Sequence, residues 1–297
     1  MRIAITGSSG LIGASLQARL EADGHTVLPV VRTAARPGTI AWDPMAGRLD
    51  PADLEGLDGV VHLAGEGIGD KRWTDEQKRK VLESRSKGTT LLAEALAATT
   101  DRPPVLVSGS AIGFYGDRGD EQLTETSGSG TGFLSEISVA WESATAAAEA
   151  AGIRVAHLRT GIVLASKGGA LGKMLPLFRL GLRGRFGSGR QWMSWITLAD
   201  EVEVIRYLLT HEVSGPVNST APNPVTNRVF AKAVGASLHR PSVVPVPVFG
   251  PRLLLGRELA DQLLFASQRV QPEVLLEAGY EFHHPELAGA LDAVLRG

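Results

Sequence analysis

The chain has 297 residues, of which 43% are hydrophobic and 21% charged, and its formal net charge is −2 at pH 7. The composition is that of an ordinary globular protein, and the length allows one large domain with a smaller one beside it. The charge argues against nucleic acid as a partner, and the absence of cysteine excludes disulfides, thiol nucleophiles and thiolate metal sites. No apolar run reaches the roughly 20 residues of a membrane span, and the histidines show no ligand spacing. We therefore expect a cytoplasmic, metal-free protein without a membrane segment.

Apolar, β-branched runs alternate with helical patterns through the first two thirds of the chain. The expected strands are 2–6, 26–31, 59–64, 104–108 and 154–159, with a short extra strand near 39–42. The expected helices between them are 11–22, 74–98 and 132–151. Strands separated by helices predict βαβ crossovers and therefore an α/β fold with a doubly wound parallel sheet, the Rossmann arrangement.

The texture of the sequence changes after about residue 160. The stretch 181–189 is basic and rich in glycine, the tract around 240–250 is rich in proline, and further helices are expected at 252–267, 272–278 and 285–296. We predict a Rossmann domain over 1–240, with substrate-lobe insertions from about 165, and a small, mostly helical C-terminal domain over 241–297. The cleft between them is the expected site.

The first expected strand ends in a glycine-rich turn that opens a helix. Gly7 permits a tight turn, Gly10 lets a pyrophosphate approach the backbone, and Gly13 lets the helix pack closely on the sheet. The free N–H groups of the helix N-terminus attract phosphate. The motif predicts a dinucleotide site formed by Gly7, Ser9, Gly10, Leu11, Ile12 and Gly13.

The ends of the next two strands carry residues suited to the adenosine half of such a cofactor. Arg32 follows the second strand, where an acidic residue commonly binds the ribose 2′-hydroxyl of NAD. An arginine there suits a 2′-phosphate, so NADP is favoured, with NAD as the alternative; a solvated surface arginine is the competing interpretation. Leu63, Ala64 and Gly65 end the 59–64 strand in small residues that leave room for the riboses.

Ser108 ends the 104–108 strand, and Ser110 and Tyr115 follow it. Ser108 is expected beside the nicotinamide, and Ser110 is placed to hydrogen-bond a substrate carbonyl or hydroxyl. A serine that closes a strand into a turn is the alternative. Tyr115 fits a packing role under the cleft as well as the role of an acid.

Several segments together resemble the extended short-chain dehydrogenase/reductase superfamily, namely TGSSGLIG, HLAGEGIGDKRW with SRSKGT, SGSAIGFYGDRGDE and LRTGIVL. The markers LAGExIxxxRW, SAxGxYGDRGDE and SQRVQPEVLLEAGYEF are similar to those of NAD(P)-dependent epimerase family proteins of the YfcH type, which carry a small DUF1731-like C-terminal domain. The resemblance implies a Rossmann core that binds NAD(P) and a cleft like that of nucleotide-sugar epimerases. It also places Arg159 and Thr160 at the nicotinamide end and Asn218 in the substrate lobe.

The chain departs from the superfamily at its catalytic pair. Typical members carry Tyr-x-x-x-Lys on the helix after the serine strand, and the lysine lowers the pKa of the tyrosine that exchanges a proton with substrate. None of the three tyrosines here is followed four residues later by lysine. An approximate alignment places Ile137 and Trp141 at these positions. Glu136 and Glu142 on the same helix, and Tyr115 with Ser110, are candidate replacements; solvated helix glutamates are the alternative for the first two.

Arginine and tryptophan pairs mark the expected far wall of the cleft. Arg190 precedes Trp192 and Trp195, and Arg72 with Trp73 stands in the loop after the 59–64 strand. Such pairs stack on and clamp planar anionic ligands such as nucleotides. Burial of the tryptophans against the C-terminal lobe is the alternative.

These features predict an NADP(H)-binding epimerase or oxidoreductase with an atypical active site. Its expected substrate is a small polar molecule, for which a nucleotide-linked sugar is one option. The rival hypothesis is a catalytically silent NADP-binding sensor or scaffold, which the missing Tyr/Lys pair would permit. The oligomeric state stays open.

Overall fold

A computed structural model describes residues 1–32, 36–179, 184–240 and 244–296. Its centre is a seven-stranded sheet in the spatial order β3-β2-β1-β4-β5-β7-β11, and every neighbouring pair is parallel. The strands are β1 (Arg2–Thr6), β2 (Thr26–Val31), β3 (Ile40–Ala41), β4 (Gly59–His62), β5 (Val105–Ala111), β7 (Arg154–Thr160) and β11 (Gly215–Ser219). The predicted doubly wound parallel sheet is therefore confirmed.

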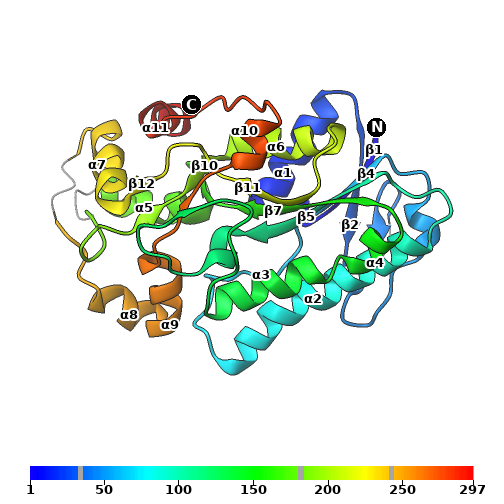
Figure 1. Cartoon of the computed structure of the whole chain (residues 1–297), viewed down its shortest axis with the longest axis horizontal. Helices are drawn as coiled ribbons and strands as arrows, with labels where there is room; N and C mark the ends of the chain where they lie inside the picture. Colours follow the sequence, from blue (N-terminus) through cyan, green and yellow to red (C-terminus); the bar gives the residue numbers. More distant parts are fainter. Residues whose placement is uncertain (33–35, 180–183, 241–243, 297) are drawn as a thin grey trace.

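Helices cover both faces of the sheet (Figure 1). One face carries α1 (Leu11–Ala22) and α6 (Leu198–Thr210), and the other carries α2 (Asp75–Ala98), α3 (Phe133–Ser143) and α4 (Ala146–Ala150). Within β1, Ile3 and Ile5 pack into the α1–α6 core while Ala4 packs into the α2–α4 core. Because both faces are buried, the strand reads as a continuous apolar run.

The structure differs from the sequence-based elements at several places. β5 runs three residues beyond the expected end at 108, which puts Ser110 inside the strand. The expected helix 132–151 is divided into α3 and α4. The strand β11 was not predicted, because it is short and begins with Gly215-Pro216, two residue types that weaken a strand signal.

Smaller elements complete the fold between the strands and after them. Three two-stranded ladders pair β8 (Ile162–Leu164) with β10 (Trp195–Thr197), β9 (Trp192–Met193) with β12 (Val225–Thr226), and β6 (Gln122–Leu123) with β13 (Arg269–Val270). The remaining helices are η1 (Pro51–Leu54), η2 (Ile112–Tyr115), α5 (Gly169–Arg179), α7 (Asn227–Ser237), α8 (Phe249–Leu255), α9 (Arg257–Ala260), the π-helical turn η3 (Asp261–Phe265), α10 (Glu273–Glu277) and α11 (Leu287–Arg296). The expected helix 252–267 is thus three short pieces.

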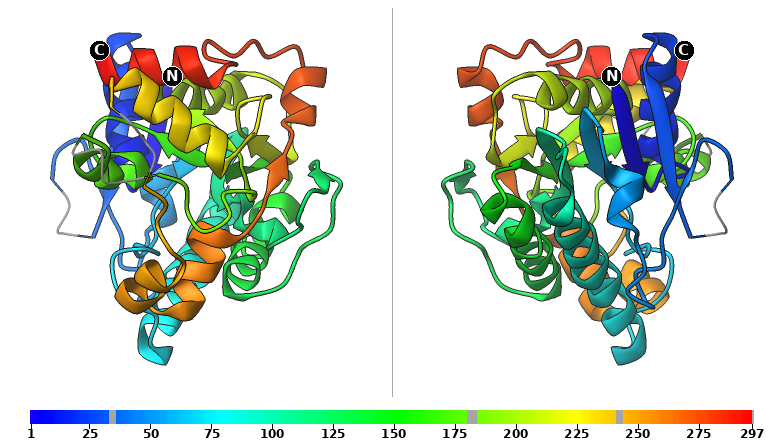
Figure 2. Two further views of the ribbon diagram at one scale, coloured as in Figure 1. Left: turned by 90° about the vertical axis from the view of Figure 1, so that its left-hand side faces the viewer. Right: turned by 90° about the vertical axis from the view of Figure 1, so that its right-hand side faces the viewer.

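The C-terminal elements pack against the rest of the chain. Figure 2 shows α8 and α9 (orange) beside the N-terminal end of α2 (cyan), where Lys78 forms an ion pair with Glu258. Leu291 of α11 shares an apolar cluster with Phe230 of α7. The predicted domain boundary at 240 stays a prediction. None of the helices in the described ranges combines the length and the hydropathy of a membrane span, and no group of three potential metal ligands occurs in them.

Candidate functional site

The turn after β1 leaves no room for a side chain at Gly7 or at Gly13. Gly7 has a φ of +70°, and its carbonyl oxygen accepts a hydrogen bond from the Gly10 amide at 2.9 Å. A Cβ on Gly13 would lie 2.3 Å from that same oxygen, and a Cβ on Gly7 would lie 2.8 Å from the Leu63 carbonyl carbon. Among the described residues, no side chain caps α1 and no acidic residue stands in its first turn. Within that part of the chain the helix N-terminus therefore has no capping side chain and its amides are free for an anion, while the dinucleotide contacts of this turn stay a prediction.

The end of β4 lies beside this turn and is held by a buried hydrogen-bond chain. The Thr6 hydroxyl accepts from the amides of Leu63 and Ala64, each at 3.1 Å. Thr6 Oγ1 also lies 2.7 Å from His62 Nδ1, and the other ring nitrogen lies 2.8 Å from Thr89 Oγ1. Burial lowers the pKa of His62 to about 3, so its ring is neutral. These bonds fix the edge where the predicted ribose contacts lie.

Arg32 lies exposed just beyond β2, where the sequence placed it. It lines a shallow hollow together with Arg48 and Asp43. Arg48 pairs with Asp43 at 2.8 Å. Arg32 has no ion-pair partner among the described residues, which leaves its guanidinium available to a phosphate. Its role in NADP binding stays a prediction.

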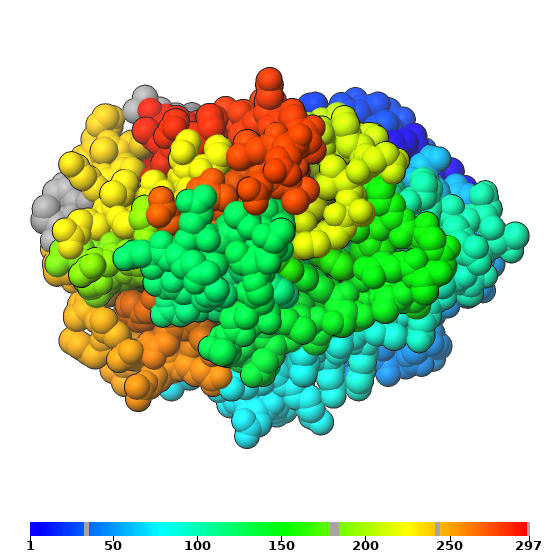
Figure 3. All heavy atoms as spheres, viewed as in Figure 1, coloured from blue at the N-terminus to red at the C-terminus, as the bar shows by residue number. Residues whose placement is uncertain are grey.

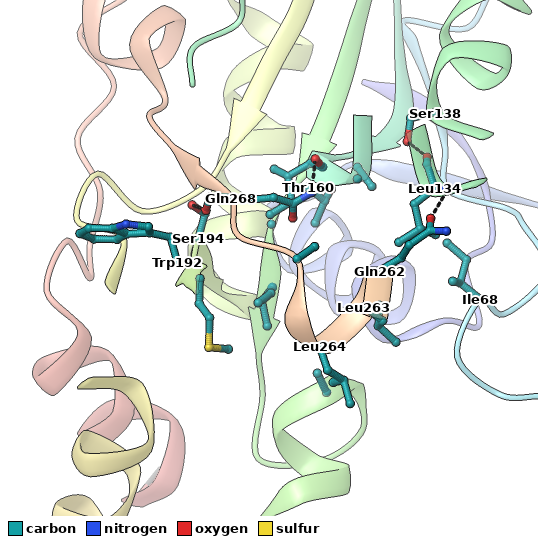
Figure 4. A pocket seen from close by; sticks show the side chains of 18 of the residues that line it. Ile68, Leu134, Ser138, Thr160, Trp192, Ser194, Gln262, Leu263, Leu264 and Gln268 are labelled. Atoms are coloured by element: carbon teal, nitrogen blue, oxygen red, sulfur yellow. Dashed lines mark hydrogen bonds between the residues drawn. The ribbon is translucent and has the colours of Figure 1, made fainter. Parts of the chain in front are cut away.

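A cavity of about 250 Å³ lies at the carboxyl ends of β5 and β7 (Figure 4). Ala111, the last residue of β5, and Thr160, the last residue of β7, both line it. Ile137 and Trp141 of α3 also line it and are 2% and 7% exposed. The two positions aligned with the missing Tyr/Lys pair thus border this cavity, and both side chains there are apolar.

The C-terminal segment closes one side of the cavity. Gln262, Leu263 and Leu264 of η3 line it, and the Gln262 side-chain oxygen accepts a hydrogen bond from the Leu134 amide at 2.9 Å. In Figure 3 the α8–η3 segment (orange) borders the segment that leads into α3 (green). Residues far apart in the chain, from Ile68 to Gln268, therefore form a single site.

A positive charge reaches the cavity from α2. The guanidinium carbon of Arg85 lies 4.8 Å from the centre of the Trp141 ring, and Arg85 Nη1 donates to the carbonyl oxygens of Glu66 at 3.0 Å and Val81 at 3.1 Å. Burial lowers the pKa of Arg85 to about 10, so it stays charged at neutral pH. A Cβ on Gly65 would lie 2.9 Å from the same guanidinium carbon, so the Arg85 side chain can take this position only because residue 65 is a glycine.

Five of the predicted site residues meet in a buried network instead of in the cavity lining. Arg159 donates to both carboxylate oxygens of Glu142 at 2.8 Å, and the Ser110 hydroxyl donates to Glu142 at 2.7 Å. Arg159 also donates to the Tyr115 hydroxyl at 2.9 Å, which in turn donates to Asn218 at 2.7 Å. Burial raises the pKa of Tyr115, which makes it a weaker acid.

The other predicted residues are dispersed. Trp192 lines the cavity, and its indole N–H donates to Asp120 at 2.9 Å. Trp195 is buried in the core, whereas Arg72 is exposed and donates to the Leu254 carbonyl oxygen at 2.9 Å. Three further residues lie outside the described cavity lining: exposed Arg190, exposed Glu136, and Trp73, which packs edge-to-face on Phe133. The buried Ser108 hydroxyl has no hydrogen-bond partner among the described residues.

A buried carboxyl that sequence reasoning missed stands behind the cavity wall. Glu201, in the first turn of α6, accepts hydrogen bonds from the Thr160 hydroxyl at 2.7 Å and from the Ser219 hydroxyl at 2.5 Å. Burial raises its pKa to about 7. An acidic residue in a first helical turn is ordinary, and its burial depends on β7 and on the unpredicted β11. The sequence therefore carries no signal for it.

Replacing Glu201 by glutamine should change how stability depends on pH. The pKa of this carboxyl is raised from 4.5 to about 7 in the fold, so the folded state holds the proton more tightly and the wild type loses stability as the pH rises between these values. Glu201→Gln cannot ionise, and we expect it to be more stable than wild type by up to roughly 3 kcal/mol near pH 8 and similar near pH 5. Urea unfolding at both pH values measures the difference.

Glu212→Gln is the matched control, because the Glu212 side chain is 94% exposed. It should follow the pH dependence of the wild type. Equal stabilities of Glu201→Gln and wild type near pH 8 would contradict the assignment of a buried, ionising carboxyl.

Comparison with known proteins agrees with this geometry. Residues 3–221 match the NAD dependent epimerase/dehydratase family, and residues 246–294 match a domain of unknown function, DUF1731. Epimerase family protein Mb2239 of Mycobacterium bovis is 43% identical over 97% of this chain and 96% of its own length, and human epimerase family protein SDR39U1 is 36% identical over 99% and 100%.

Two solved structures resemble the fold over almost the whole chain. The crystal structure of human SDR39U1 with NADPH has a TM-score of 0.90 at 34% identity, and covers 100% of both chains. The nucleoside-diphosphate sugar epimerase from Corynebacterium glutamicum has a TM-score of 0.82 at 39% identity, over 99% of this chain and 58% of the other. The chain therefore belongs to the NAD dependent epimerase/dehydratase family, as its motifs predicted.

Proposed function

We propose that this protein is an NADP(H)-dependent oxidoreductase of the epimerase type, which acts on a small organic molecule in the cavity between β5, β7, α3 and η3. The observation that carries the proposal is the turn at Gly7, Gly10 and Gly13, where a Cβ would collide with backbone and the helix N-terminus is uncapped. NADP(H) is preferred over NAD(H) because Arg32 is unpaired among the described residues, and because the human relative was crystallised with NADPH.

The residues around the turn fit the cofactor. The amides at the start of α1 would hold the pyrophosphate, Arg32 the 2′-phosphate, and Leu63, Ala64 and Gly65 the riboses. When bound, the reduced nicotinamide supplies a hydride to a carbonyl carbon. Trp141 and Ile137 exclude water from the cavity, and Arg85 supplies the positive charge that a lysine on α3 supplies in typical members.

The proton in this proposal comes from Thr160. Its hydroxyl belongs to a cavity-lining residue and is bonded to Glu201, which is partly protonated at neutral pH because its pKa is about 7. A proton lost from Thr160 Oγ1 to a ligand oxygen is replaced from the Glu201 carboxyl. Thr160 therefore stands ahead of Ser110, Tyr115 and Glu136 as the proton donor, and the roles of those three stay predictions.

The second candidate is a silent NADP(H)-binding sensor or scaffold. It is favoured by the apolar side chains of Ile137 and Trp141 at the catalytic positions of the superfamily. Turnover separates the two functions, because a sensor binds NADPH without consuming it in the presence of any carbonyl substrate.

Gly13→Ala should weaken cofactor binding. The added methyl group would lie 2.3 Å from the Gly7 carbonyl oxygen, so either α1 or the phosphate-binding turn must move. We expect the Kd for NADPH, measured by calorimetry, to rise at least tenfold. Gly289→Ala in α11 is the control, because nothing lies within 4 Å of a Cβ there. Wild-type affinity in a folded Gly13→Ala protein would remove the main support for the proposal.

Arg32→Ala should weaken NADPH selectively. A charge-assisted contact to phosphate accounts for about a tenfold change in Kd, and NADH lacks that phosphate. We expect the Kd for NADPH to rise about tenfold and that for NADH to stay unchanged. Arg48→Ala, whose guanidinium is paired with Asp43, is the control. An equal loss for both cofactors would show that Arg32 does not read the 2′-phosphate.

Thr160→Val should lower turnover without affecting cofactor affinity. Loss of a positioned general acid reduces the rate by about 100-fold or more, so kcat for carbonyl reduction, followed by NADPH absorbance, should fall by that factor. The Kd for NADPH should not change. Thr220→Val is the control, because the Thr220 hydroxyl is buried and has no partner among the described residues. Undiminished turnover in Thr160→Val would assign the proton to another group.

A further inference from the structure

We propose that the cavity binds the apolar body of a small carbonyl compound, or of the corresponding alcohol, with its single oxygen at the Thr160 hydroxyl. This inference rests on the proposed function, because it names the substrate class of the same site. It is carried by the chemistry of the cavity lining, and its test includes a binding measurement that does not depend on turnover.

Apolar side chains from four separate elements form most of the wall (Figure 4). They include Ile137 and Trp141 of α3, Met174 of α5, Met193 of β9 and Leu264 of η3. Contact with such a surface is favourable for apolar ligand groups, which leave water on binding. A ligand hydroxyl that finds no partner there loses its hydrogen bonds to water, which weakens binding by about tenfold or more.

Most polar side chains of the lining are already bonded within the protein; the exceptions are Trp141 Nε1 and Arg85 Nε, which are buried without a hydrogen-bond partner among the described residues. The hydrogen bonds of the others are Ser138 to the Leu134 carbonyl oxygen at 2.9 Å, Ser194 to the Gln268 carbonyl oxygen at 2.8 Å, Gln268 to the Ile112 carbonyl oxygen at 2.9 Å, the Leu134 amide to Gln262 at 2.9 Å, and the Phe186 amide to Asn227 at 2.7 Å. A ligand with several polar groups would have to break these bonds. The wall thus selects against such ligands.

Thr160 differs from these residues because the direction of its hydrogen bond with Glu201 depends on whether the Glu201 carboxyl carries a proton. While Glu201 is ionised, the Thr160 hydroxyl donates to it at 2.7 Å. Once Glu201 is protonated, its carboxyl donates to the threonine oxygen, and the hydroxyl hydrogen can turn to a ligand in place of its long contact with the Leu158 carbonyl oxygen at 3.4 Å. Thr160 then offers a neutral donor in addition to the Trp141 Nε1–H, which has no partner in the described ranges, and these few donors suit a ligand with one carbonyl or hydroxyl oxygen.

A nucleotide-linked sugar, one of the options left open by the sequence, is less well matched to this wall. Each sugar hydroxyl needs a partner, and the diphosphate needs cations or amide donors. Arg85 is the one charged side chain of the lining in the described ranges, and its Nη1 already donates to the carbonyl oxygens of Glu66 and Val81.

The size and the opening of the cavity suit a ring or a short chain. Its volume of about 250 Å³ exceeds the roughly 150 Å³ of an engineered apolar cavity that takes up benzene. Leu263 lines the cavity and is also 44% exposed, which marks the opening. Figure 4 shows Ile68 and Gln262 near Leu263, so a ligand entering there passes more apolar surface than polar surface.

Binding of acetophenone, an apolar ring with one carbonyl oxygen, tests the inference. Ligand-observed NMR titration of the full chain, with and without saturating NADPH, gives the Kd and shows whether UDP-glucose displaces the ketone. We expect acetophenone to bind and UDP-glucose not to displace it. Leu263→Gln should weaken acetophenone about fivefold, because it replaces apolar surface at the opening. Leu276→Gln, at 46% exposure on α10, should leave the Kd unchanged.

The outcomes separate the two proposals. Absence of acetophenone binding, equal effects of the two leucine variants, or displacement by UDP-glucose at a lower concentration than that of the ketone would overturn the substrate class. Acetophenone binding with the expected Leu263 effect, in a protein that does not bind NADPH, would instead overturn the proposed function and leave the apolar site in place.

Discussion

The buried ion pair between Arg159 and Glu142 holds together the elements that form the cavity. Arg159 lies on β7 and Glu142 on α3, and both of their hydrogen bonds are 2.8 Å long. The same two side chains bind Ser110 on β5 and Tyr115 in η2. Removing either member would leave a charge buried without its partner, which costs about 3–5 kcal/mol in comparable pairs. The position of α3 against the sheet, and with it the position of the cavity wall, depends on this pair.

The ion pair also explains why Ser110 and Tyr115, which the sequence put forward as catalytic candidates, form hydrogen bonds within the fold instead. Ser110 and Tyr115 direct their hydroxyls into the network, so the strand end keeps its residue types while their hydrogen bonds hold the fold. The chemical groups near the cavity come from other elements. Arg85 extends from α2 and packs against Gly65, where a larger residue would collide with it. Glu201 lies on α6 and accepts a hydrogen bond from the Thr160 hydroxyl. In the function proposed above, a site built from these other elements would keep a cation and a proton source without Tyr-x-x-x-Lys.

Sequence reasoning reached the features that are local in the chain. Gly7, Gly10 and Gly13 could be assigned because their geometry is set within one turn, and the short strand near 39–42 is confirmed as β3 (Ile40–Ala41). The direction of the Ser110 hydroxyl could not be predicted, since it depends on a partner 32 residues away. Glu201 was missed for the same reason, because its burial requires β7 and β11 to lie beside α6. The apolar character of the cavity was hidden because its wall joins α3 to η3, more than a hundred residues later in the chain.

The C-terminal segment gives the cavity its chemical character. Without η3, Leu263 and Leu264 would be missing from the wall, and Ile137 and Trp141 would face water. Water would then compete with the Thr160 hydroxyl for a hydrogen bond to the ligand oxygen. With η3 in place, the Leu134 amide of α3 donates to Gln262 and Lys78 of α2 pairs with Glu258, so the segment is fastened to both α3 and α2. The enclosed space has a low dielectric, so one hydroxyl and one guanidinium act more strongly there than at an open edge of the sheet. Residues 246–294 also match a separate domain family. This is consistent with the proposal that the Rossmann core binds the cofactor and that the C-terminal segment determines which ligands fit the cavity.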